Sequence, residues 1–230
     1  MNKSSIKVKI VRCGEAILPT SIIYHFLSLV YIRRFNRAKV IFIHIPKAAG
    51  TSIAFSLYGK RVGHFKASYI KKKMGNNNYL SYPSFCVTRN PYDRLLSAYF
   101  YAKQGGTSEG SIRNQGLYRT SQFSSFQNFV SKWLPNQDLN KVDLIFRPQY
   151  LFVYNKGEKL VDFIGKSEDM NKVESFLTEK LKRPVKFSKH NASLRTGSLK
   201  QHYTYDLTDM VYNLYKEDFI RFGYPKELPE

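Results

Sequence analysis

The sequence predicts an α/β domain in which parallel strands form a central sheet with helices on its flanks. Short apolar runs rich in β-branched residues recur along the chain, as in strands that a sheet buries on both faces. Segments with helical spacing of apolar residues separate these runs. The 230 residues suit one domain, and 43% of them are hydrophobic and available for its core.

The first 38 residues are expected to form a helical segment that precedes a domain spanning residues 39–230. Basic residues flank an apolar stretch from Ala16 to Ile32, with Arg33-Arg34 directly after it. The stretch contains Pro19 and is short for a membrane span, which needs roughly 20 apolar residues. We therefore expect a helix that lies against the domain or on a membrane surface, and a true span is the less favoured alternative.

The first strand, turn and helix of the domain follow one another without a gap. Lys39 to Ile45 (KVIFIHI) predicts a buried parallel strand. Pro46 to Gly50 predicts a turn. Thr51 to Leu57 predicts a helix with Thr51 or Ser52 near its N-cap.

The remaining elements continue this alternation. Ser84 to Thr88 predicts a second buried strand that ends at Asn90-Pro91, and Tyr92 to Lys103 has helical spacing. The polar stretch 104–120 predicts a loop. Further along we expect a helix over 123–133, a third strand over 160–164, and helices over 170–181 and 207–222.

The turn after the first strand has the composition of a phosphate-binding loop. Backbone N–H groups at a helix start carry partial positive charge and point at a ligand. Gly50 allows close backbone approach, Thr51 and Ser52 offer hydroxyl groups, and Lys47 offers a cation. The order differs from the Walker pattern because the lysine precedes the glycine. An ordinary strand–turn–helix with a surface lysine is the alternative.

The end of the second strand is the other candidate for phosphate binding. Arg89 ends that strand, at the carboxyl edge where open α/β sheets bind ligands. Arg94 and Ser97 share a face of the next helix. A guanidinium group and a hydroxyl suit a second phosphate. The alternative is a capping arginine beside a solvated serine.

These two segments, IPKAAGTS at 45–52 and RNPYDRLLSAY at 89–99, resemble those of sulfotransferases that use 3′-phosphoadenosine 5′-phosphosulfate (PAPS). The resemblance is to the carbohydrate-modifying branch, which includes heparan sulfate 2-O- and chondroitin sulfotransferases and bacterial members. It continues at Arg147-Pro148-Gln149, 162–165, Glu168, 190–193 and 215–224, and so covers about residues 39–225. It implies a P-loop-like, three-layer fold.

The resemblance also implies roles for single residues. The first loop would hold the 5′-phosphosulfate, and the arginine and serine of the second segment would hold the 3′-phosphate. The residues expected to bind the nucleotide are Lys47, Ala49, Gly50, Thr51, Ser52, Arg89, Ser97, Asn191 and Ser193. The role of Glu168 stays open.

Transfer of a sulfuryl group needs an in-line arrangement, a positive charge for the leaving oxygen and a base for the acceptor's proton. Lys47 is expected to supply the charge. His64 is expected to be the base, because related sulfotransferases carry a catalytic histidine in a comparable Gly-His segment; a surface-loop histidine is the alternative. His190 is the second candidate, and His44 is expected to be structural.

The net charge of +20 favours anionic partners, and the first 75 residues carry +14 of it. We expect PAPS as the donor, a carbohydrate acceptor for which an acidic glycan would suit the charge, and contact of the N-terminal segment with an anionic membrane surface. Neither a metal site nor nucleic-acid binding is expected. A P-loop-type nucleotide kinase, or a non-catalytic protein that binds nucleic acid or acidic glycan, is the alternative. We expect a cytoplasmic, membrane-associated protein of bacterial type rather than a Golgi enzyme.

Overall fold

The computed structural model describes residues 20–107, 110–112, 115–187 and 198–229. Its core is a parallel sheet with the strand order β1–β2–β7. These strands are Ile41–Ile43, Ser84–Thr88 and Phe163–Lys166. Phe42 pairs with Phe85, and Cys86 pairs with Ile164. Every residue of β1 and β2 is buried, so the predicted central parallel sheet is confirmed.

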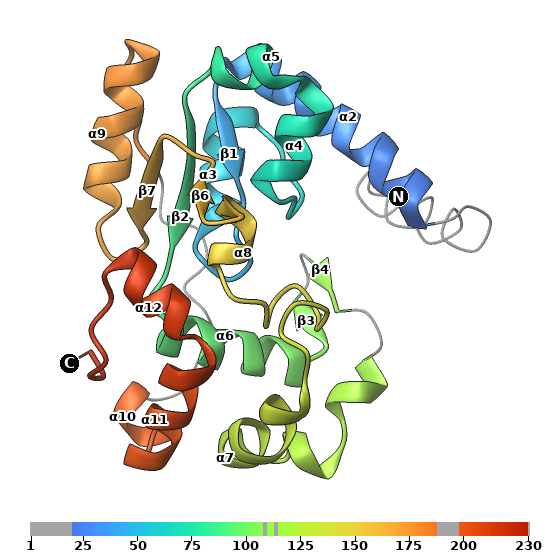
Figure 1. The fold of residues 1–230 in the computed structure, drawn as a ribbon, viewed down its shortest axis with the longest axis vertical. Coiled ribbons are helices and arrows are strands. Elements are labelled where there is room, and N and C mark those ends of the chain that lie inside the picture. Colours follow the sequence, from blue (N-terminus) through green and yellow to red (C-terminus); the bar gives the residue numbers. More distant parts are fainter. Residues whose placement is uncertain (1–19, 108–109, 113–114, 188–197, 230) are drawn as a thin grey trace.

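Helices cover both sides of this sheet and complete three layers (Figure 1). The helices are α2 Thr20–Ala38, α3 Gly50–Tyr58, α4 Ala67–Met74, α5 Asn76–Leu80, α6 Pro91–Lys103, α7 Phe126–Asn128, α8 Tyr150–Val153, α9 Met170–Leu181, α10 Leu199–His202, α11 Tyr205–Leu214 and α12 Lys216–Phe222. On one side α9 stacks the ring of Phe176 on that of Phe163 in β7, with 4.4 Å between centroids. On the other side lie α4 and α2.

Helix α2 lies against the domain along one face. Phe35 is buried and its ring centroid is 5.5 Å from that of Tyr58, while Tyr24 and Tyr31 both contact Phe65. Within the described residues no helix is long and apolar enough to cross a membrane. The expectation for residues 16–19 falls outside the described residues, and the domain boundary at residue 39 stays a prediction.

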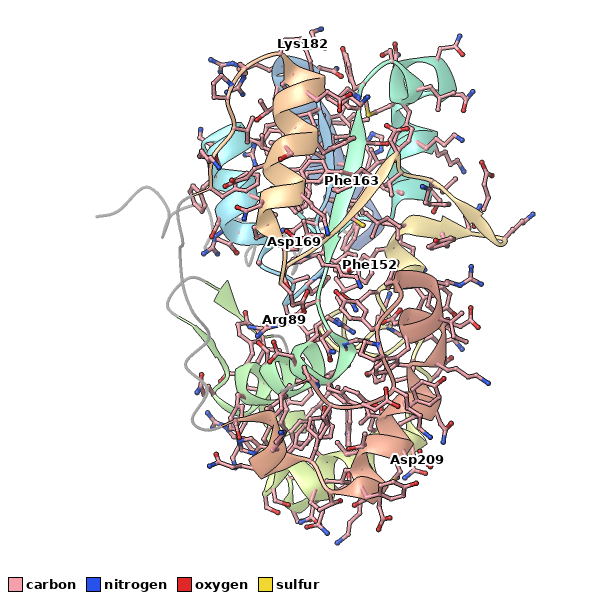
Figure 2. All side chains as sticks on the ribbon, turned by 90° about the vertical axis from the view of Figure 1, so that its left-hand side faces the viewer. Arg89, Phe152, Phe163, Asp169, Lys182 and Asp209 are labelled. Atoms are coloured by element: carbon pink, nitrogen blue, oxygen red, sulfur yellow. The ribbon has the colours of Figure 1, made fainter. Side chains whose placement is uncertain are left out.

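Beyond these three layers, a mainly helical part of the domain lies past the carboxyl ends of the strands (Figure 1). We call this part the helical layer. It contains α6, α7 and α10–α12, with a cluster of aromatic rings around Tyr99 of α6. Figure 2 shows Arg89 at the junction of this layer with the sheet. The junction holds both candidate phosphate-binding segments.

The helix predicted over 123–133 begins three residues later, at Phe126, and is irregular. The chain forms successive short turns: 3-10 turns at Gln115–Tyr118 and Ser121–Phe123, then α7, a π turn at Phe129–Trp133 and a 3-10 turn at Leu134–Asn136. Ser124 Oγ donates to the Ser121 carbonyl, and Ser125 Oγ accepts from Asn128 N. The Ser125 bond is an N-cap, and it explains why the helix begins at Phe126 instead of Phe123.

Three other predicted elements also differ from the structure. Residues 207–222 form two helices, because the chain turns at Tyr215 (φ −112°, ψ 20°), whose buried hydroxyl donates to the Phe146 carbonyl. The third strand begins later than predicted, since Leu160 N pairs with the Val153 carbonyl beside a small hairpin instead. That hairpin is β5 Tyr154–Asn155 with β6 Glu158–Lys159. A second one, β3 Gly106–Thr107 with β4 Gly110–Ser111, lies in the stretch predicted as a loop.

Candidate active site

The turn between β1 and α3 has an unusual backbone. Lys47 (φ 65°) and Ala49 (φ 58°) both adopt left-handed conformations, which cost a residue with a side chain roughly 1–2 kcal/mol each. Left-handed residues alternating with others aim successive N–H groups into one concave surface that suits an anion. The first N–H groups of α3 adjoin it, and no side chain caps them. Thr51 and Ser52 lie on the first turn of α3.

Gly50 is fixed by its neighbour His44. A Cβ atom at Gly50 would lie 2.0 Å from Cδ2 and 2.3 Å from Nε2 of the His44 ring. His44 is buried and its Nδ1 is 3.2 Å from the Val62 carbonyl. His44 therefore has the structural role expected for it, because its ring packs beneath the turn that contains Gly50.

Lys47 is partly buried at the entrance of this turn. Its Nζ lies 4.2 Å from the centre of the Tyr101 ring, which attracts a cation through its electron-rich face. Burial, together with the nearby Arg89 guanidinium, lowers the pKa of Lys47 to about 8. At pH 7 the ammonium group is thus still mainly charged.

The structure brings the two predicted segments into contact. Arg89 Nη1 donates to the Lys47 carbonyl over 3.3 Å, and Arg89 Nε donates to Asp93 over 2.6 Å. The Gln149 amide group accepts from Arg89 N (3.0 Å) and donates to the Arg89 carbonyl (2.9 Å). Glu168 accepts from Asn90 N (2.6 Å). The backbone that carries Arg89 is therefore held on both sides.

Ser97 and Arg94 lie deeper than the sequence indicated. Ser97 is 3% exposed, and its Oγ has no hydrogen-bond partner within the described residues. Arg94 is 1% exposed and donates to the carbonyls of Ile145 (3.1 Å) and Arg147 (2.6 Å). Arg94 thus anchors the chain around residue 146, which differs from the phosphate contact predicted for it.

His64 lies beside the phosphate loop with its ring orientation fixed. Its Nδ1 is 2.9 Å from the His44 carbonyl. Because a carbonyl can only accept, Nδ1 carries the proton and Nε2 keeps a free lone pair. Burial is the main cause that lowers the pKa of His64, with smaller contributions from Lys47 and Arg61, while Asp143 acts in the opposite direction. A neutral imidazole is the form that can act as a base.

Sequence reasoning missed the role of Gln149 and Asp218. The Asp218 carboxylate, fully buried, accepts from Gln149 N and Tyr150 N, both over 2.8 Å. Burial raises the pKa of Asp218 to about 6, against the effects of Arg94 and of these two bonds. Gln149 is itself fully buried. The available signal was the presence of polar residues within the two downstream blocks at 147–149 and 215–219.

The remaining candidates divide into two groups. Glu168 is a support residue, since it also accepts from the Tyr224 hydroxyl (3.2 Å). Asn191, Ser193 and His190 fall outside the described residues. Among the residues that the structure describes, no group of three His, Cys, Asp or Glu side chains is arranged to hold a metal ion.

Comparison with known proteins identifies the family. The model of the sulfotransferase family matches residues 31–225. Carbohydrate sulfotransferase 12 of Mus musculus is 24% identical over 208 residues, which cover 76% of this chain and 47% of that protein. The chain thus spans about half the length of this relative. No solved structure matches. The chain belongs to the sulfotransferase family, and its central parallel sheet with flanking helices is a P-loop-like α/β fold.

Proposed function

We propose that this protein transfers the sulfuryl group of PAPS to a hydroxyl of a carbohydrate acceptor. One observation carries the proposal: the Lys47 loop and the Arg89 segment, 42 residues apart in sequence, are hydrogen-bonded to each other beside His64. The two segments offer separate sites for the two phosphate-bearing ends of one nucleotide. Metal ions are not required in this proposal, because the protein supplies the positive charge.

The donor nucleotide would span the junction of sheet and helical layer. The left-handed turn at Lys47 and Ala49, with the start of α3, suits the 5′-phosphosulfate. Arg89 and the Ser97 hydroxyl suit the 3′-phosphate. A buried hydroxyl without a partner costs about 1–3 kcal/mol, and a phosphate oxygen at Ser97 would remove that cost. Asn191 and Ser193 are also proposed to contact the nucleotide, on the basis of the family resemblance alone.

The chemistry follows from the positions of two side chains. His64 Nε2 accepts the proton of the acceptor hydroxyl while the hydroxyl oxygen forms a bond to sulfur. The bond between sulfur and the phosphate oxygen breaks, and adenosine 3′,5′-bisphosphate leaves with the bonding electrons. The Lys47 ammonium stabilises the charge that grows on that oxygen. The Tyr101 ring holds this ammonium in place.

Transfer of labelled sulfate from PAPS to a panel of glycans tests the proposal. We expect label on at least one glycan, with the same rate in EDTA. Labelling from ATP that depends on magnesium, with none from PAPS, would favour the nucleotide kinase instead. Binding of glycans or oligonucleotides without any transfer would favour a non-catalytic binding protein.

We also propose that α2 contacts an anionic membrane surface, with the protein on the cytoplasmic side. Ile22, Phe26, Leu29 and Val30 are exposed at helical spacing on one side of α2. Arg33 and Arg37 follow on the same helix. A basic helix with an exposed apolar face is typical of interfacial binding.

Vesicle co-sedimentation measures this contact. Phe26→Ser is expected to weaken binding to vesicles that contain phosphatidylglycerol by roughly tenfold or more, from the lost burial of one large side chain. Ile220→Ser is the matched control, because Ile220 is 59% exposed and Phe26 is 60% exposed. Equal binding by both variants would exclude α2 as the contact.

A further inference from the structure

A pocket of about 210 Å³ opens where α4 meets α8 and the β5–β6 hairpin. The side chains that give it its chemistry are Lys66, Ser68, Tyr150, Tyr154, Lys156 and Arg221. In the part of the chain that the structure describes, its lining includes three basic residues and no acidic one. Aromatic and cationic side chains around a small cavity suit a ring-shaped ligand that carries negative charge.

Arg221 is held in a fixed orientation in this pocket. Its guanidinium carbon lies 4.8 Å from the centre of the Tyr154 ring and 5.5 Å from that of Tyr150. Its Nε donates to Glu217 over 2.6 Å, so the two terminal nitrogens stay available to a ligand among the described contacts. A stacked guanidinium is well suited to bind a carboxylate or sulfate through two parallel bonds.

Two lysines from different elements add positive charge to the pocket. Lys66 comes directly before α4, and the Arg147 guanidinium is near enough to help lower the pKa of Lys66. Lys156 is at the tip of the β5–β6 hairpin, where it (φ 48°) and Gly157 (φ 85°) form the two-residue turn. Asn or Gly is the usual residue at such a position, and here the turn carries a cation.

The pocket adjoins the site of chemistry. Lys66 follows His64 by two residues, so their Cα atoms are at most about 7 Å apart. Tyr150 is the direct neighbour of Gln149, which holds the Arg89 backbone. A sugar in this pocket would therefore lie close to the hydroxyl that His64 deprotonates.

We propose that this pocket binds an anionic group, carboxylate or sulfate, on an acceptor sugar that neighbours the sugar receiving the new sulfate. This assignment rests on the proposed function and gives it a substrate class, an acidic glycan. The pocket recognises the chain of the acceptor, while His64 acts on its hydroxyl.

The double variant Lys66→Gln, Lys156→Asn removes two charges from the pocket. Asn suits the left-handed position of Lys156, so the hairpin keeps its shape. Lys132→Gln, Lys182→Asn is the matched control. Lys182 is also left-handed (φ 52°) and ends α9 far from the pocket (Figure 2), and Lys132 is exposed in the helical layer. Both double variants lower the net charge by the same amount.

Fluorescence anisotropy with labelled hexasaccharides, in saturating adenosine 3′,5′-bisphosphate, measures the effect. The probes are unsulfated chondroitin, its carboxyl-reduced form, and the carboxyl-reduced form after sulfation, which carry carboxylates, no charge and sulfates. The experiment uses about 150 mM salt, where exposed charges more than roughly 8 Å apart are largely screened. The unaltered protein is expected to bind a charged probe roughly fivefold or more tightly than the neutral one.

The pocket variant is expected to lose this preference and the control variant to keep it. The charged probe whose affinity falls identifies the anionic group. Equal affinity of the unaltered protein for charged and neutral probes would overturn the proposal, and so would equal losses in both double variants. Calorimetry with adenosine 3′,5′-bisphosphate separates this result from the proposed function. If the nucleotide binds and the pocket variant shows no specific loss, only the pocket assignment fails; if the nucleotide does not bind, the proposed function fails.

Discussion

The Nδ1 atom of His64 is bound to the backbone, so Nε2 is the ring nitrogen that can accept a proton, and this division suits the base role proposed for His64. The His44 carbonyl fixes the tautomer and the ring plane. Burial keeps the imidazole neutral by lowering its pKa. A charged imidazolium could not accept the acceptor's proton.

The pH dependence of kcat/KM should therefore have two limbs. Activity is expected to rise with pH through the His64 pKa, which lies below 6.5, because the imidazole must be neutral. It should fall as pH exceeds about 8, because Lys47 then loses its charge.

His64→Ala should lower kcat by roughly 10²–10⁴-fold, remove the rising limb and leave nucleotide affinity intact. His25→Ala is the control; a rising limb that survives in His64→Ala would move the base to another residue, with His190 first.

Gly50 should be irreplaceable only while His44 is present. Gly50→Ala places a Cβ within the His44 ring, and such overpacking typically costs about 1–3 kcal/mol. In a His44→Ala background the same change should cost less, because the ring is gone, and urea unfolding of the four proteins gives the coupling energy. Gly116→Ala is the control, since a Cβ there meets no atom within 4 Å. Costs that simply add would show that the ring does not limit residue 50.

At the scale of elements, a buried polar connection joins β2 to α8 and α12. Asp218 of α12 accepts two N–H groups from the segment at 149–150, and Gln149 of that segment holds the Arg89 backbone. Asp218→Asn is expected to lower the unfolding free energy by about 1.5–3 kcal/mol, since an amide accepts these charged bonds poorly. Asp209→Asn removes a surface pair with Lys226 and should cost at most about 1 kcal/mol. Similar losses for both variants in urea unfolding would refute a special role for Asp218.

The elements that sequence periodicity predicted well are those whose own residues decide their structure. β2 and α9 have the predicted bounds, because an unbroken apolar run and an amphipathic pattern leave little choice. The helix predicted over 123–133 begins only at Phe126, because Ser125 caps it and a separate turn at Ser121–Phe123 precedes it. The break at Tyr215 depends on a hydroxyl bond to Phe146, 69 residues away in sequence. Tertiary contacts of this kind leave no local signal.

The candidate active site likewise combines features that local sequence predicts with features that depend on tertiary contacts. The residue types and spacing around Lys47 and Arg89 alone predict phosphate binding. The burial of Arg94 and the support from Gln149 could not be predicted, because both depend on how distant segments meet. The groups proposed to contact a ligand thus come from local sequence, and the residues that position them come from the fold.

At the scale of the whole molecule, the proposed nucleotide contacts both the turn after β1, which contains Lys47, and the segment after β2, which contains Arg89. Its binding should therefore stabilise the entire domain. A ligand at 100 times its dissociation constant adds about 2.7 kcal/mol to the unfolding free energy. Adenosine 3′,5′-bisphosphate should therefore raise the melting temperature more than AMP does at equal concentration, because only the former can engage Arg89 and Ser97.

Arg89→Ala tests this claim within a single protein. The variant also loses the bond to the Lys47 carbonyl and the pair with Asp93, so its melting temperature without ligand is expected to fall. The informative quantity is the difference between the melting-temperature shifts caused by the two nucleotides, which does not depend on that baseline.

This difference should vanish in Arg89→Ala, with a loss of about 1.5–3 kcal/mol for a charged hydrogen bond. It should persist in Arg119→Ala, which removes an exposed arginine. A difference that survives in Arg89→Ala would place the 3′-phosphate elsewhere, and equal shifts in the unaltered protein would mean that the 3′-phosphate is not recognised at all.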